Sequence, residues 1–139
     1  MSERHFQMRL ECRYRDPGNE VAALAVEILD NDAWRPLDLS IGSPGFQVFV
    51  YGIFSCQHLY VRTNCAELGL MLDSAHGHIH VAAGDDWTID SLHVEFEARL
   101  RSGNPSQAAI DHIVDRMGRC PSSINLRQIA DTRVSLKLL

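Results

Sequence analysis

Apolar and polar residues alternate strictly over residues 6–15, the period of a strand with one buried face. A proline and a glycine within residues 16–19 predict a turn, because proline presets its own φ and glycine accepts a positive φ. We expect residues 21–29 to form the returning strand of a hairpin. After a second turn at residues 31–32, the pattern predicts a third, shorter strand over residues 35–41.

A long helix is predicted from Ser43 to Leu68 or Gly69. Serine is a frequent N-cap, proline suits the first helical position, and glycine is a natural stop. Few charges interrupt residues 46–61, and apolar side chains lie all round this part of the helix, as in buried helices. We therefore expect the helix to form the centre of the domain. A helix this apolar needs more cover than one small sheet provides, which predicts a homodimer.

The second half of the chain predicts two strands, an amphipathic helix and a last strand, over residues 72–83, 88–100, 104–118 and 132–138. Asn104-Pro105 is expected to begin that helix and Gly118 to end it. A short turn or helix is expected after Cys120. The order of strands, buried helix, strands, helix and strand predicts one α+β domain over residues 1–139.

Composition narrows the classes of function. The 139 residues are 45% hydrophobic and 22% charged, which allows a core without structural metal or disulfides. The net charge of −5, with no basic cluster, argues against nucleic acid or an anionic membrane as a partner. No apolar run approaches the roughly 18 residues of a membrane span, and the first residues do not resemble a signal peptide. We therefore expect a cytoplasmic protein that carries no cofactor and no metal.

The four cysteines are the candidate reactive groups. A reducing cytosol disfavours a disulfide framework, and no pair has the CxxC spacing of zinc sites or thioredoxin motifs. One cysteine by itself is more often an inert buried thiol than a reactive one. Cys12, in mid-strand among inward apolar residues, is interpreted in that way.

Two of the remaining cysteines cannot pair with each other. Cys56 and Cys65 lie on the same predicted helix, on opposite faces and about 13 Å apart, whereas a disulfide needs Cα atoms within about 7 Å. Cys120 follows a glycine stop and precedes Pro121, a place where a turn can present a thiol. The N-terminus of a following short helix would favour its thiolate.

Two segments resemble the OsmC and organic hydroperoxide resistance (Ohr) family. Phe-Ser-Cys-Gln-His at residues 54–58, with Leu-Gly-Leu at 68–70, resembles the family's central helix, which carries a cysteine in its middle. Residues 115–123, with Cys120 before a proline, resemble the family's second cysteine site. The separation of the two cysteines, 64 residues, is similar to that of the family.

The resemblance implies an OsmC-like fold, with antiparallel sheets packed around a long buried central helix in an intertwined homodimer. It also implies reduction of organic hydroperoxides: Cys56 would form a sulfenic acid, Cys120 would resolve it to a disulfide, and an external dithiol would reduce that disulfide. The family's activating arginine would come from the first hairpin. Arg15, which borders the turn, is the candidate, with Arg13 also available; a solvated charge at the strand end is the alternative for Arg15.

In one respect the chain departs from the family, whose peroxidases carry a glutamate near the start of the central helix. Here that stretch includes Phe46 and Gln47 and has no carboxylate. Without a nearby cation the pKa of Cys56 stays ordinary or rises on burial, which leaves little thiolate at neutral pH. Two hypotheses therefore stand: a thiol peroxidase, and a non-catalytic OsmC-fold dimer that binds a small apolar ligand at its interface.

Three histidines form a second candidate site, one for a metal ion. His76, His78 and His80 alternate on one strand face, and neighbouring imidazoles at this spacing can share a metal ion. The first and third would be about 13 Å apart, too far for one ion. We interpret the three as a polar outer face, with adventitious zinc or nickel binding as the alternative. His58 lies about 200° round the helix from Cys56 and is expected to point away from it.

Overall fold

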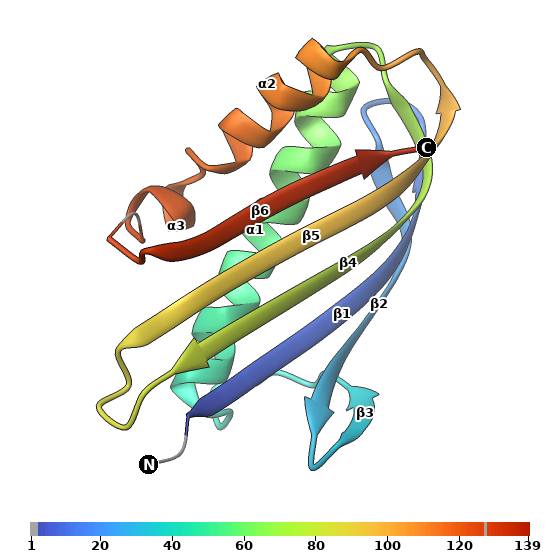
Figure 1. The fold of residues 1–139 in the computed structure, drawn as a ribbon. Coiled ribbons are helices and arrows are strands. Elements are labelled where there is room, and N and C mark those ends of the chain that lie inside the picture. Colours follow the sequence, from blue (N-terminus) through green and yellow to red (C-terminus); the bar gives the residue numbers. More distant parts are fainter. Residues whose placement is uncertain (1–2, 127) are drawn as a thin grey trace.

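The computed structural model describes residues 3–126 and 128–139 and consists of one six-stranded sheet with helices on one face (Figure 1). The strand order is β3-β2-β1-β4-β5-β6. The strands are β1 (Arg4–Arg15), β2 (Glu20–Asp30), β3 (Ala33–Pro36), β4 (Met71–Ala83), β5 (Ile89–Ser102) and β6 (Asp131–Leu138). The helices are α1 (Gly45–Glu67), α2 (Gln107–Met117) and α3 (Pro121–Ile124).

The predicted α+β class and element order are confirmed, but the sheet differs from the expected antiparallel sheets. There is one sheet, and β6 pairs with β5 in parallel. A parallel neighbour needs a crossover connection, and α2 and α3 supply it between β5 and β6. Strand β3 is also shorter than expected: it ends at Pro36, which has no N–H to donate to the ladder, instead of running over residues 35–41.

The helix starts differ slightly from the prediction. Helix α1 has Pro44 as its N-cap and begins at Gly45, because the Ser43 hydroxyl accepts a hydrogen bond from the Ser40 N–H (2.9 Å) in the preceding turn. Helix α2 is capped by Ser106, whose Oγ accepts from the Ala109 N–H at 3.1 Å, and not by the preceding Asn-Pro pair. Gly118 ends α2 as expected.

Helix α1 lies across the inner face of the sheet, with α2 beside it (Figure 1). Its buried apolar side is formed by Val50, Ile53, Phe54, Val61 and Cys65. Within the single chain the helix is not covered on all sides, since Val48, Phe49 and Leu59 are 42–44% exposed. The sheet covers one side of the helix and α2 and α3 part of another, which leaves an apolar strip open.

Candidate thiol site

Cys56 and Cys120 meet although they come from different elements. Cys56 is in the middle of α1, and Cys120 is the N-cap of α3. The two thiols are close enough for each to shift the pKa of the other. Cys56 is partly exposed, whereas Cys120 is 0% exposed. Cys56 is therefore the more accessible residue of the pair.

The local sequence explains how Cys120 is presented. Gly118 ends α2, Cys120 takes an extended conformation, and Pro121 begins the next helix, as prolines often do. The Cys120 sulfur then acts as a helix cap and accepts a hydrogen bond from the Ser123 N–H at 3.4 Å. The hydroxyl oxygens of Ser122 and Ser123 lie 3.3 and 3.2 Å from the same sulfur.

These contacts divide the charge unequally between the two thiols. Burial raises the pKa of Cys120, but hydrogen bonds from Ser122, Ser123 and Cys56 outweigh it, so that the pKa is lowered. Burial also raises the pKa of Cys56; hydrogen bonds from Ser122 lower it, and the neighbouring Cys120 raises it further. When the pair loses its first proton, the charge therefore rests on Cys120 and Cys56 keeps its S–H.

Gln57 is a member of the site that the sequence did not single out. It follows Cys56 on α1, and its side chain is 0% exposed. Its Nε2 donates to the Met117 carbonyl at 2.9 Å, reaches the Cys120 sulfur at 3.3 Å, and contacts the Ser123 hydroxyl. An amide inside an otherwise apolar helical run was the available signal, because buried polar side chains have specific partners.

Comparison with known proteins gives the fold a name. No protein-family model matches the chain, and no curated protein has a significantly similar sequence. Solved structures do match it. An OsmC-like hydroperoxide resistance protein from Jannaschia sp. CCS1 superposes with a TM-score of 0.55 at 15% identity, over 89% of this chain and 87% of that one. An OsmC-like protein from Mycoplasma pneumoniae gives a TM-score of 0.54 at 11% identity, over 83% and 87%.

The chain has the OsmC-like fold. The fold expected from the two cysteine segments is thereby confirmed. At identities of 15% and 11% the likeness concerns the arrangement of the elements, so the chemistry rests on the side chains of this chain. None of the helices described in the structure is long and apolar enough to cross a membrane.

Arg15 does not meet Cys56 within the single chain. It follows Tyr14, whose side chain faces α1, so by strand alternation Arg15 projects from the opposite face of the sheet. Its guanidinium forms an exposed ion pair with Glu20, with 3.4 Å between Nε and Oε2. Arg13 is exposed as well. Within the chain Arg15 is therefore a solvated charge at the end of the strand, which was the alternative interpretation.

His58 points away from Cys56, as expected, and is buried in the OsmC-like core. Its Nε2 lies 2.7 Å from the Tyr14 hydroxyl, and its ring stacks on Phe96 with 5.8 Å between centroids. Burial, and to a smaller extent the nearby Arg62 charge, lower the pKa of His58 to about 4. His58 is therefore neutral at pH 7 and is too well hidden to act as a base for Cys56.

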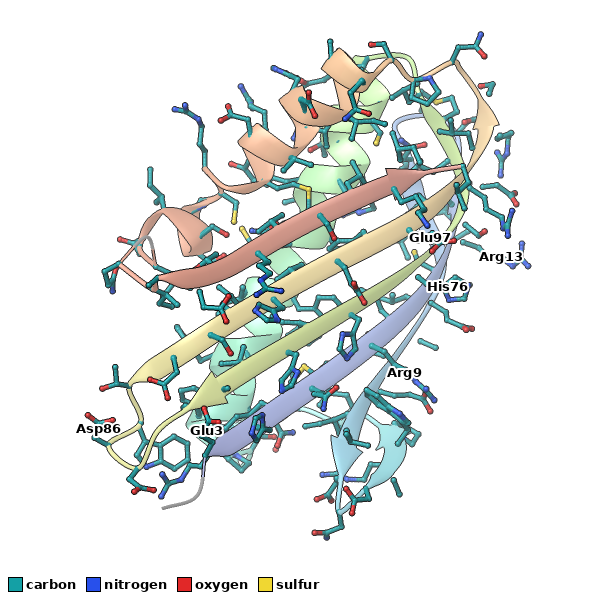
Figure 2. The ribbon with its side chains drawn as sticks, in the orientation of Figure 1. Glu3, Arg9, Arg13, His76, Asp86 and Glu97 are labelled. Atoms are coloured by element: carbon teal, nitrogen blue, oxygen red, sulfur yellow. The ribbon has the colours of Figure 1, made fainter. Side chains whose placement is uncertain are left out.

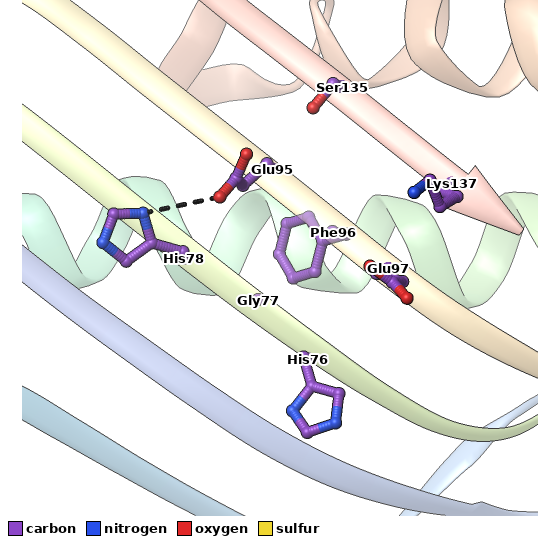
Figure 3. A pocket seen from close by; sticks show the side chains of 8 residues that line it. All are labelled: His76, Gly77, His78, Glu95, Phe96, Glu97, Ser135 and Lys137. Atoms are coloured by element: carbon purple, nitrogen blue, oxygen red, sulfur yellow. Dashed lines mark ion pairs between the residues drawn. The ribbon is translucent and has the colours of Figure 1, made fainter.

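The outer face of the sheet is polar, as the alternating histidines predicted. Figure 2 shows Arg9, His76 and Glu97 on the side of the sheet opposite α1. A shallow groove of about 260 Å³ lies there, and in it His78 Nδ1 lies 3.8 Å from Glu95 Oε1 (Figure 3). Within residues 3–126 and 128–139, no three potential ligands are placed to hold one metal ion. This face lies across the sheet from the two thiols.

Proposed function

We propose that the protein is a thiol-dependent peroxidase that reduces organic hydroperoxides with Cys56 and Cys120 and is recycled by an external dithiol. The observation that carries the proposal is the approach of two thiols from separate elements, one accessible and one buried with a lowered pKa. The OsmC-like neighbours include a protein described as a hydroperoxide resistance protein, which agrees with a hydroperoxide as the substrate class.

In the oxidative half-reaction, the Cys56 sulfur attacks the terminal oxygen of the hydroperoxide. The O–O bond breaks, Cys56 becomes a sulfenic acid, and the organic oxygen leaves as an alkoxide. The Cys56 proton passes to the Cys120 thiolate and ends on the alkoxide, which departs as the alcohol. The Cys120 thiolate then attacks the Cys56 sulfur and displaces hydroxide, which leaves as water after taking a proton from solvent. The product is a Cys56–Cys120 disulfide.

In the reductive half-reaction, a dithiol attacks the more accessible sulfur, Cys56. The disulfide bond breaks and Cys120 leaves with the electron pair, which suits the sulfur with the lower pKa. The second thiol of the reductant then attacks its own sulfur in the mixed disulfide and releases Cys56. This chemistry needs a compartment that keeps thiols reduced, such as the cytoplasm.

We further propose that two subunits associate through the open face of α1. The apolar side chains of Val48, Phe49 and Leu59 are exposed along this face, and a second subunit would remove them from water. Such a dimer would place an apolar surface near Cys56, because Phe49 lies two helical turns before it on the same face.

The alternative function is non-catalytic binding: an OsmC-fold dimer that binds an apolar ligand without turnover. The raised pKa of Cys56 favours this alternative, because a protonated thiol is a weak nucleophile. The exposed apolar face of α1 is compatible with either function.

Consumption of cumene hydroperoxide in the presence of dithiothreitol distinguishes the two. We expect turnover by the wild type, none by Cys56→Ser, and a single oxidation of Cys120→Ser that a dimedone reagent traps as a Cys56 sulfenic acid. Cys65→Ala is the control, since Cys65 is 0% exposed in the core and should not affect turnover. A wild-type protein with both thiols reduced that consumes no hydroperoxide would favour the ligand-binding alternative.

A further inference from the structure

We infer that Gln57 is the positioning residue that holds the Cys120 sulfur against Cys56. The inference deepens the proposed function by naming the side chain that makes the thiol pair ready to form a disulfide. It concerns the pairing of the sulfurs, which any thiol oxidant can report, and can therefore be tested whether or not hydroperoxides are the substrate.

The Gln57 amide ties the segment that carries Cys120 to α1. Its Nε2 lies 2.9 Å from the Met117 carbonyl oxygen and 3.3 Å from the Cys120 sulfur, and it also contacts the Ser123 hydroxyl. These groups span the end of α2, the cap of α3 and the first turn of α3. One side chain next to Cys56 therefore contacts the connecting segment on both sides of Cys120.

The Met117 contact fixes which end of the amide faces the sulfur. A backbone carbonyl only accepts hydrogen bonds, so the NH₂ end of Gln57 must point toward Met117. The same NH₂ group then offers a hydrogen to Cys120, and a donor stabilises a thiolate more than a thiol. A flipped amide would place two carbonyl oxygens against each other.

The other end of the amide shows that this position is not shaped for stability alone. The Gln57 Oε1 is buried and has no hydrogen-bond partner within the described residues. A buried acceptor without a partner destabilises the folded state, and an apolar side chain of similar length would avoid that cost. The NH₂ contacts to Met117, Cys120 and Ser123 account for an amide here.

The expected consequence is a high effective concentration of one thiol at the other. Helix α3 has four residues and by itself gives Cys120 little support, whereas α1 is a rigid 23-residue helix. Fixing two reacting groups in contact speeds their reaction because the entropy of bringing them together is already lost. Without the amide, Cys120 would keep its serine contacts but lose its tie to the helix that carries Cys56.

The test is the equilibrium of the Cys56–Cys120 disulfide with glutathione buffers, which gives the effective concentration of the thiol pair. Gln57→Met keeps the length of the side chain but removes the hydrogen bonds that hold the Cys120 segment at the Met117 carbonyl and the Ser123 hydroxyl. At a pH at which both thiols are protonated, so that no hydrogen bond to a thiolate favours the reduced pair, we expect the effective concentration to fall about tenfold, the effect of losing one neutral hydrogen bond. Alkylation of Cys120 by iodoacetamide, followed by peptide mass spectrometry, should shift to higher pH in the same variant.

The matched control is Asn64→Leu. Asn64 is another buried amide on α1, 3% exposed, with an Oδ1 that has no partner within the described residues and an Nδ2 that donates to the Tyr60 carbonyl at 2.8 Å. It does not contact Cys120, so its replacement should leave the effective concentration and the alkylation profile unchanged. Gln57→Glu is the second variant: it keeps the shape and a polar end, but its carboxylate cannot donate to the Met117 carbonyl, so the effective concentration should fall as in Gln57→Met. Its charge should also raise the pKa of Cys120 and shift the alkylation of Cys120 to higher pH.

The outcomes separate clearly. A folded Gln57→Met protein with an unchanged effective concentration and alkylation profile overturns the inference, as does an equal loss in Asn64→Leu. If Gln57→Met does not fold, Gln57→Glu decides by the same two measurements. Absence of hydroperoxide turnover in the wild type would reject the proposed function and leave this result standing, because glutathione disulfide is the oxidant here.

Discussion

Acidification should destabilise the folded protein through the buried His58. The side chain is 6% exposed, its Nε2 is 2.7 Å from the Tyr14 hydroxyl, and its ring lies against Phe96. Burial lowers its pKa from 6.5 to about 4 in the folded protein. An unfolded chain restores the ordinary pKa, so between pH 6.5 and 4 the unfolded state binds a proton that the folded state does not.

The sign and size follow from this difference in pKa. His58 is neutral in the folded protein, and its pKa is lower there than in the unfolded chain. It therefore stabilises the fold fully above the pKa of the unfolded chain, and this contribution is lost as the pH falls. The whole difference of pKa corresponds to roughly 3 kcal/mol of unfolding free energy, all of it present above pH 6.5 and lost progressively toward pH 4. The free energy of unfolding of a whole domain is typically roughly 5–15 kcal/mol, so the contribution of His58 is a large part of it.

Urea unfolding followed by tryptophan fluorescence, at a series of pH values from 7.5 to 4 and one protein concentration, measures this loss. His58→Gln removes the titration and keeps a polar partner for Tyr14, so its stability should change much less over the same pH window. An equal decrease in wild type and His58→Gln would refute the reasoning and assign the acid sensitivity to other groups.

Three further predictions concern packing, assembly and the unused thiols. Gly77→Ala should lower the unfolding free energy by about 1–3 kcal/mol, because a Cβ there would lie 2.6 Å from a ring carbon of Phe96. Gly45 has open space around it, so Gly45→Ala should be nearly neutral in the same urea titration. Phe49→Arg places a charge on the exposed apolar face of α1, so light scattering should change from a dimer to the 15.6 kDa monomer, and a monomeric wild type would reject the interface. Cys65→Ala should lower the unfolding free energy by roughly 1 kcal/mol and leave hydroperoxide turnover intact; loss of turnover in the folded variant would show that Cys65 belongs to the site.

Local pattern by itself determined most of the elements of this protein. The alternation in residues 6–15 predicted β1, and the apolar run after Pro44 predicted α1, because the periodicity of neighbouring side chains distinguishes a strand from a helix. The place of Cys120 was also readable, since a glycine stop before it and a proline after it leave a cysteine at the N-cap of a short helix. Its pairing with Cys56 came from excluding Cys65 by helix geometry and from the family resemblance.

Only the tertiary structure decided what lies beside each element. The parallel placement of β6 next to β5 and the projection of Arg15 from the outer face depend on sheet order and on which face α1 covers. The contact of Gln57 with Cys120 joins residues 63 positions apart and exists only because α2 and α3 pack against α1. Periodicity shows that a side chain is buried, but its partner comes from another part of the chain, and long-range packing selects that partner.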